Sequence, residues 1–360
     1  MRTLLLFLLV GSASAQTGSL VGTVLGETGE PLSGATVYLS GTTRGDATDD
    51  AGRYEILSVP PGAYRLVGSL VGYEPVVQEV DLEDGDTVTT DFTLYTARRT
   101  VGFVRVEAPR DTRWTGQNVR FVRAFLGESA RGDSARIVNP EVLEFQERAG
   151  VLQAAAAKPL LIENRALGYL LTYDLRAFVQ TADEVRYDGD ARFEPLDPGS
   201  DLEAERWARA RADAYRGSLA HLLRTLVEDD LEDSGFTLTL DEDRATGTMG
   251  TMGQGDAARV VRRRDVFRHD RDGGGVLRFR GELGVRYDEP EDPAFARSAL
   301  VRGESRPTAN AQQSLIELRA PEVRLDERGT PEAPLDVLTR GYMGFERLAD
   351  LVPDDYAPDR

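Results

Sequence analysis

Apolar and polar residues alternate over short stretches near the start of the chain, which is the pattern of half-buried β-strands. In residues 35–40, the side chains of Ala35, Val37 and Leu39 fall on one face of an extended chain. The same alternation, or a short apolar run, occurs at residues 20–25, 43–48, 53–56, 63–66, 76–82 and 88–94. About seven short strands at this regular spacing predict a β-sandwich.

Glycine and proline mark the turns between these segments. Residues 48–66, TDDAGRYEILSVPPGAYRL, contain an acidic turn closed by Gly52 and a second turn at Pro60-Pro61-Gly62. Proline fixes φ near the value that a turn needs, and glycine adopts the positive φ that other residues avoid. We therefore expect one sandwich domain over residues 18–97.

The pattern changes after residue 97. Residues 98–118 are predicted to be a strand or linker, because their second half is polar and includes Pro109 and Gly116. Further strands are predicted at residues 143–146, 151–155, 160–162, 169–178, 184–187 and 191–194, the last two as a hairpin across Asp188-Gly189.

A helical pattern interrupts these strands at about residues 201–234. Asp201 is a suitable N-cap, Gly217 is expected to break the helix, and Gly235 to end it. The apolar residues of the second half recur at helical spacing: Leu219, Leu222, Leu223, Leu226 and Val227. Residues 119–360 are thus predicted to form a β-rich α+β domain with an inserted helical pair, and the whole chain to be mainly β.

The first residues have the features of a secretory signal peptide. Arg2 precedes an apolar run at residues 4–10, and small residues at positions 12–15 provide a cleavage site after Ala15. We interpret residues 1–15 as this signal, and expect a periplasmic, outer-membrane associated or secreted protein. The chain has no cysteine, which excludes disulfides and thiolate metal sites, and no later stretch predicts a transmembrane segment.

The charge is strongly negative. Asp and Glu number 61 against 43 Lys and Arg, a net charge of −18, and Lys158 is the only lysine. An acidic surface repels nucleic acid and anionic membranes, so neither is expected as a partner. Acid-rich, lysine-poor composition is typical of salt-adapted, halophilic bacteria.

The stretch GTVLGETGEPLSGATVYLSGTTRGDATDDAGRYEILSVPPGAYRLVGSLVGYEP resembles the carboxypeptidase regulatory-like domain, a transthyretin-like sandwich. The matching pieces are Gly22, Gly29, Pro31, Gly34-Ala35, Thr48-Asp49, Gly52-Arg53-Tyr54, Pro61-Gly62 and Gly72-Tyr73. The resemblance implies an exported protein of the Bacteroidetes type, in which this module accompanies outer-membrane receptors or peptidases and is not itself catalytic.

A second resemblance covers much of the remaining chain. NPEVLEF, PLLIENRALGYLLTYDL, RYDGDARFEPL, AYRGSLAHLLRTL and LTRGYMGFERLADLVPDDY are similar to the region that follows the sandwich in a set of uncharacterised exported proteins. That set often carries a Cys shortly before the Asn-Pro-Glu, where this chain has residues 134–136, Ser-Ala-Arg. The resemblance implies no function for this region.

The histidines exclude a zinc carboxypeptidase site. Such a site needs His-x-x-Glu, but Arg224 stands three residues after His221, and Asp272 three residues after His269. The chain also lacks H-E-x-x-H, the G-x-S-x-G nucleophile elbow and the phosphate-binding loop. We expect no cofactor, and more generally no enzyme.

Weak candidates for chemistry remain. An unrecognised hydrolase site would draw on Glu163, Tyr215, His221 and Arg224. A sugar would stack on exposed aromatic rings, for which Tyr38 and Tyr73 are the candidates, unless both pack into the sandwich. A calcium ion would need several oxygen ligands, which Asp46, Asp49 and Asp50 offer, although their spacing fits an ordinary acidic turn as well.

The favoured hypothesis is an exported, non-catalytic binding or structural accessory protein of the cell envelope, whose partner is an envelope protein or a glycan. One alternative is a carbohydrate- or peptide-binding module. The other is a hydrolase with its site near His221.

Overall fold

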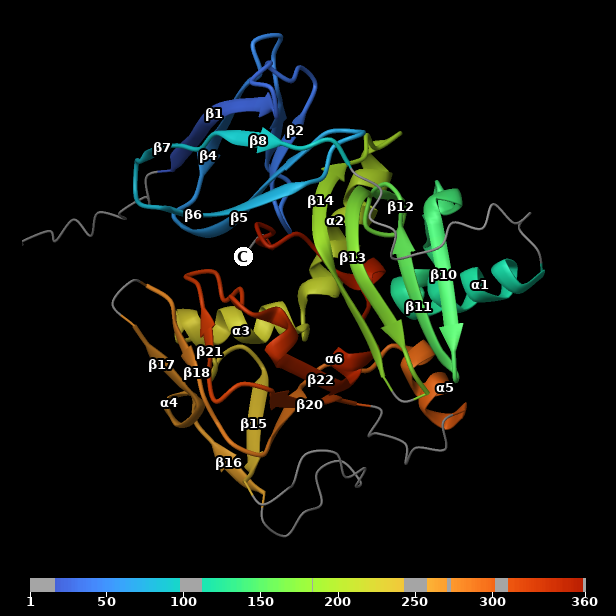
Figure 1. Cartoon of the computed structure of the whole chain (residues 1–360). Coiled ribbons are helices and arrows are strands. Elements are labelled where there is room, and N and C mark those ends of the chain that lie inside the picture. The colour runs from blue at the N-terminus through green and yellow to red at the C-terminus, as the bar shows by residue number, and fades with distance from the viewer. Residues whose placement is uncertain are drawn as a thin grey trace, which may run out of the picture. The chain divides into compact units, whose positions relative to one another are not determined.

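The computed structural model describes residues 17–97, 112–182, 184–242, 258–270, 273–301 and 310–358 (Figure 1). These residues form two compact units. The first contains the described residues up to Val37 together with Gly45–Thr96, and the second contains Tyr38–Arg44 together with the residues from Ala97 onward. The predicted signal peptide, residues 98–111 of the predicted strand or linker, and the Gly-rich stretch at residues 243–257 lie outside the described residues.

The first unit is a β-sandwich of short strands, as the alternation predicts. The strands are β1 (Gly18–Gly26), β2 (Thr36–Leu39), β3 (Gly45–Ala47), β4 (Arg53–Val59), β5 (Gly62–Ser69), β6 (Val76–Leu82), β7 (Thr87–Thr89) and β8 (Phe92–Leu94). One sheet has the order β4-β1-β7, with β8 also on β1, and the other has the order β3-β2-β5-β6. Leu20, Val24, Ile56, Leu66 and Phe92 are buried between them.

The expected strand at residues 88–94 is divided in two. Both β7 and β8 pair with β1 in parallel, at Val21 with Thr89 and at Val24 with Phe92. Between them, the amide of Thr23 donates to the side chain of Asp91 at 2.8 Å instead of to a backbone carbonyl. The strand therefore keeps its direction, and its regular pairing with β1 is interrupted only at residues 90–91.

The described residues of the second unit form three sheets. Their strands are β9 (Ala135–Ile137), β10 (Leu143–Arg148), β11 (Val151–Ala156), β12 (Leu160–Asn164), β13 (Tyr169–Gln180), β14 (Val185–Pro195), β15 (Phe236–Asp241), β16 (Arg259–Val261), β17 (Phe267–His269), β18 (Gly275–Leu277), β19 (Glu282–Tyr287), β20 (Gln312–Leu318), β21 (Val323–Leu325) and β22 (Val337–Gly341). The sheet orders are β10-β11-β13-β12-β9 with β14 on β13, β16-β15-β19-β20-β22, and β17-β18-β21. Together with the sandwich, this confirms a mainly β fold.

The predicted hairpin across Asp188-Gly189 is wrong, because β14 runs through these residues as one long strand paired with β13. Gly189 serves a different purpose from a turn. A Cβ on it would lie 2.4 Å from the carbonyl oxygen of Asp174 and 2.5 Å from the ring of Tyr173. The glycine thus allows a close approach between two strands.

Helices accompany these sheets. They are α1 (Thr112–Leu126), α2 (Asp201–Tyr215), α3 (Leu219–Glu228), α4 (Arg263–Val266), α5 (Pro293–Val301) and α6 (Tyr342–Phe345), with single 3-10 turns at Gly132–Ser134, Pro140–Val142, Pro334–Asp336 and Leu348–Asp350. The sequence did not predict α1, since residues 112–118 were expected to be strand or linker. Its Phe121 and Phe125 are fully buried against the six-stranded sheet, which explains why the helix forms there.

The predicted helical pair is present with different ends. Ser200, not Asp201, caps α2, because its hydroxyl accepts the amide of Glu203. Gly217, at φ +76°, separates the two helices as expected. The second helix ends at Glu228 rather than near Gly235, since Asp229 takes the left-handed conformation that Asp tolerates better than most residues.

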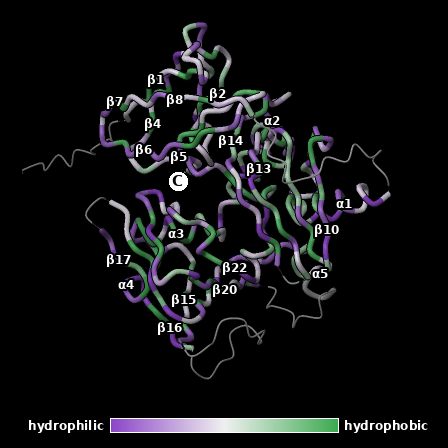
Figure 2. The backbone as a smooth tube through the Cα atoms, viewed as in Figure 1, coloured by the Kyte–Doolittle hydropathy of each residue, from purple (hydrophilic) through white to green (hydrophobic). Residues whose placement is uncertain are grey.

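Two apolar cores hold the second unit together. One joins α1 to the six-stranded sheet, and the other joins α3 to the five- and three-stranded sheets. In Figure 2 apolar and polar residues are interspersed along the chain. Among the described residues, no helix combines the length and the apolar character that crossing a membrane requires.

Candidate functional site

His221, on the first turn of α3, lies in a cluster of aromatic rings. Its ring centroid is 4.8 Å from that of Tyr215, 4.9 Å from Phe236 and 5.7 Å from Tyr287. The amide of Gly217 donates to Nδ1 at 3.1 Å. Burial, reinforced by the neighbouring Arg224, lowers the pKa of His221 to about 4, so the ring is neutral at pH 7.

Tyr215 and Arg224 lie beside this histidine, as the hydrolase hypothesis requires. The Arg224 guanidinium stands 5.3 Å from the centre of the Tyr215 ring. It donates to three backbone carbonyls, those of Asp354 at 2.8 Å, Tyr356 at 2.7 Å and Arg328 at 3.3 Å. Arg224 therefore fixes the C-terminal segment of the described chain. Burial also raises the pKa of Tyr215, which keeps its hydroxyl protonated.

Glu163, the fourth hydrolase candidate, has other partners. On β12 its carboxylate accepts from Arg136 Nε at 2.6 Å and from Arg165 Nε at 2.7 Å. These two hydrogen bonds lower the pKa of Glu163 below its ordinary value. The carboxylate is thus ionised and held by Arg136 of β9 and by Arg165 in the turn after β12, whereas the other three candidates meet near the start of α3.

The acidic residues of the sandwich act mainly in turns. Asp49 accepts the amides of Ala51 and Arg53 at 2.9 and 2.8 Å. Asp46 accepts the amide of Glu55 at 2.9 Å, and Asp50 accepts the Ser33 hydroxyl. Across the described ranges, no three His, Cys, Asp or Glu side chains gather in a way that could hold a metal ion.

The two candidate aromatic residues differ in exposure. Tyr38 is 1% exposed, and its hydroxyl donates to Asp174 Oδ2 at 2.8 Å. A buried ring with an engaged hydroxyl has no face for a sugar. Tyr73 is half-buried and forms an isolated bridge with Thr96, next to Tyr95, which is 55% exposed.

The sequence does not predict two groups of carboxylates that burial affects in the structure. Asp350, 2% exposed, accepts from Ser129 Oγ at 2.6 Å, Arg131 Nε at 2.9 Å and the amide of Arg347 at 3.0 Å. Burial and the nearby Asp350 raise the pKa of Glu346 well above its ordinary value. In the sequence, the only indication that these acids are buried is their position between apolar residues in the stretch GFERLADL.

The second group lies on β13 and β14. Asp174 and Asp190 are opposite each other in the register of these strands, and Asp190 is 2% exposed. Arg176 forms ion pairs with Asp190 and with Asp188. Burial raises the pKa of Asp174. An acid within the long apolar segment YLLTYDL was again the available signal.

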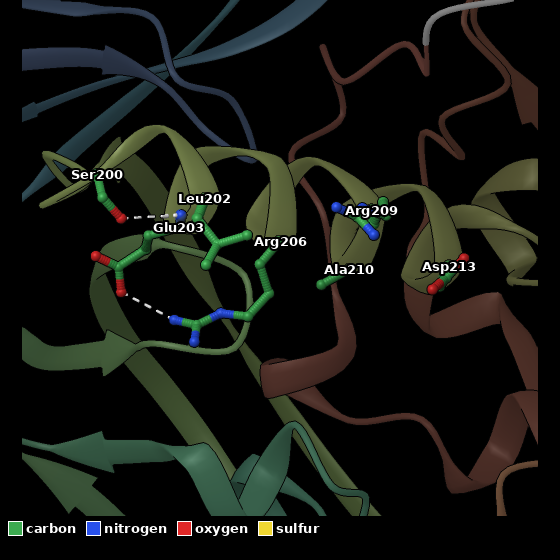
Figure 3. Close-up of a pocket in the computed structure, with 7 residues that line it drawn as sticks. All are labelled: Ser200, Leu202, Glu203, Arg206, Arg209, Ala210 and Asp213. Atoms are coloured by element: carbon green, nitrogen blue, oxygen red, sulfur yellow. Dashed lines mark hydrogen bonds and ion pairs between the residues drawn. The ribbon is translucent and has the colours of Figure 1, made fainter.

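Figure 3 shows a surface hollow along the exposed side of α2. It is lined by Ser200, Leu202, Glu203, Arg206, Arg209, Ala210 and Asp213. Its charges are compensated locally, since Glu203 forms an ion pair with Arg206 at 2.9 Å. The side chain of Leu202 is 73% exposed. None of the predicted site residues lines this hollow.

Comparison with known proteins bears on the first unit. The family model of the carboxypeptidase regulatory-like domain matches residues 19–95, which are the strands of the sandwich. Residues 19–95 are a carboxypeptidase regulatory-like domain. The match includes the turn at Gly52, the Pro-Pro-Gly turn and Tyr38–Arg44 of the second unit, whereas the residues from Ala97 onward lie outside it.

A curated relative shares part of this sequence. The TonB-dependent receptor P39 of Formosa agariphila is 40% identical over 85 residues, which are 24% of this chain. The match spans 8% of the receptor's length. The matched stretch is thus about as long as the regulatory-like domain.

Solved structures show only slight likeness to the chain. Catechol 1,2-dioxygenase from Pseudomonas arvilla C-1 matches with 17% identity and a TM-score of 0.21 over 29% of this chain and 60% of that one. The minor pilin GBS52 of Streptococcus agalactiae matches with 21% identity and a TM-score of 0.21 over 26% and 49%. At these scores the matches carry no argument about function.

Proposed function

We propose that the protein is an exported, non-catalytic accessory protein of the cell envelope, in which the regulatory-like domain serves as a scaffold. The similarity of this domain to part of a TonB-dependent receptor supports an envelope role. The predicted signal at residues 1–15 supports export, with the periplasm, the outer membrane or the exterior as the destination.

The engagement of the candidate side chains supports a non-catalytic role. Arg224 is occupied by three carbonyls, and Glu163 by two arginines. The His221 ring is neutral and accepts a backbone amide at Nδ1. A general base must reach the proton that it removes, and a nucleophile must reach its base. The partners already in these positions favour a structural role for all three residues.

Export is tested first. The full chain with a C-terminal tag, and the same chain without residues 2–15, are expressed in a Gram-negative host and fractionated. We expect the full chain in the envelope or periplasmic fraction, with a mature N-terminus at Gln16 by mass spectrometry. A full chain that keeps Met1 and stays in the cytoplasm would refute the proposal.

The non-catalytic role needs a separate test. The purified mature chain is screened against peptide, glycoside and ester substrates, next to the His221→Ala variant. We expect no turnover in either. Turnover that disappears in His221→Ala, while the variant keeps the folded fluorescence spectrum, would favour the hydrolase alternative.

A further inference from the structure

Residues Tyr38–Arg44, which are the end of β2 and the turn that leads to β3, belong to the second unit, and we refer to them as the strap. The strap pairs with the outer edge of β14. The amide of Gly41 donates to the carbonyl of Ala191 at 2.7 Å, and the amide of Phe193 donates to the carbonyl of Thr42 at 3.0 Å. The opposite edge of β14 is paired with β13 along its length. The strap therefore satisfies backbone groups that an edge strand leaves open.

Side chains of the strap also form hydrogen bonds with Asp174 and Asp190, which lie opposite each other on β13 and β14. Tyr38 donates its hydroxyl to Asp174 at 2.8 Å, and Ser40 donates its hydroxyl to Asp190 at 2.7 Å. Two carboxylates opposite each other on neighbouring strands repel, and burial strengthens that repulsion. The hydroxyl donors of the strap reduce this cost, together with Arg176.

The far side of the strap holds the C-terminal segment. Thr43 donates its amide and hydroxyl to the Asp355 carboxylate at 3.2 and 2.8 Å, and the amide of Asp354 donates to the carbonyl of Gly41 at 2.8 Å. Gly41 has φ +79°, and a Cβ there would lie 2.2 Å from the Asp354 carboxylate. The strap is thus bonded on both sides within the second unit.

We infer that the edge of β14 is an interaction surface whose partner is the strap of the same chain. The strap closes this edge and supplies the hydroxyl donors that the opposed acids need. The second unit, although it is built mainly from residues after position 97, is therefore complete only with residues 38–44 in place. This inference is independent of the envelope role.

The test uses the full mature chain and the change Tyr38→Phe. Trp114 and Trp207 are the only tryptophans, and both lie in the second unit, so their fluorescence reports the unfolding of that unit. The control is Tyr54→Phe, which removes another buried hydroxyl, bonded to the carbonyl of Thr90 at 2.6 Å within the first unit. We expect Tyr38→Phe to lower the urea midpoint of the tryptophan transition by roughly 0.5–1 M.

The control separates the strap from a general loss of stability. The inference is supported if Tyr38→Phe lowers the tryptophan midpoint more than Tyr54→Phe does. It is overturned if Tyr38→Phe has no effect, or an effect no larger than that of Tyr54→Phe. A double-mutant cycle of Tyr38→Phe with Asp174→Asn is a second, independent test, because coupled residues give non-additive shifts and strictly additive shifts would also overturn the inference.

Discussion

The side chain of Phe121 packs helix α1 against the six-stranded sheet. Truncating this side chain is the most direct test of the packing within the second unit. Phe121 is fully buried. Its ring centroid lies 4.7 Å from Phe178, 4.9 Å from Phe125 and 5.7 Å from Phe145. The change Phe121→Ala leaves a cavity between helix and sheet and removes all three ring contacts.

The expected loss is large. Truncating a buried Phe to Ala costs about 3–5 kcal/mol. Loss of three aromatic pairs, each contributing about 0.5–1.5 kcal/mol, places this site in the upper part of that range, at about 4–5 kcal/mol. With a denaturant slope of about 3 kcal/mol/M, the urea midpoint should fall by about 1.5 M.

Tryptophan fluorescence in urea measures this change, since Trp114 and Trp207 both lie in the second unit. The matched control is Val119→Ala on the same helix, where the side chain is 62% exposed. Alanine favours helix and little burial is lost, so the control should change stability by less than about 0.5 kcal/mol. If Phe121→Ala costs no more than Val119→Ala, the packing of α1 against the sheet is wrong.

Two pH effects follow from buried groups in the second unit. The pKa of His221 is lowered to about 4, so between about pH 4 and 6.5 the unfolded chain binds a proton that the folded chain does not, and stability falls as the pH falls through this window. His221→Phe should flatten the tryptophan-detected urea midpoint between pH 4 and 6.5, and an unchanged pH slope would contradict the burial of this ring. Burial raises the pKa of Asp354 to about 7, so the folded chain holds the extra proton between about pH 4 and 7, and stability falls as the pH rises through that window. Asp354→Asn should therefore gain stability relative to the parent at pH 8 compared with pH 5; equal differences at both pH values would refute this assignment.

The sandwich could be predicted from the sequence because its information is local. Alternating residues such as Ala35, Val37 and Leu39 and the turns at Gly52 and Gly62 fix faces and reversals within a few residues. The division of its last strand could not be predicted, since it depends on Thr23 meeting Asp91 across the sheet.

The second unit was less predictable because long-range packing overrides its local signals. The polar start of α1 indicated a linker, yet Phe121 and Phe125 find a sheet to cover. Asp188-Gly189 has the sequence of a turn, but Gly189 is needed for close contact with β13.

The candidate site shows the same limit. Tyr215, His221 and Arg224 do lie together, because Tyr215 ends α2 a few residues before α3, which carries the other two. The backbone carbonyls that accept hydrogen bonds from Arg224 belong to residues between 328 and 356, far along the chain. No local sequence pattern predicts these contacts. Buried acids such as Asp190 and Asp350 resemble surface residues in sequence, because their partners also come from distant segments.

The parallel pairing of β1 with β7 and β8 has a mechanical consequence. Since the first and last strands of the sandwich run in the same direction, the chain enters at Gly18 and leaves at Leu94 at opposite ends, separated by about 30 Å for a strand of this length. A pull on the two ends would load the hydrogen bonds between these strands in shear, so that they must break together. Under tension, the regulatory-like domain should therefore resist extension until these hydrogen bonds break, and then unfold in a single step.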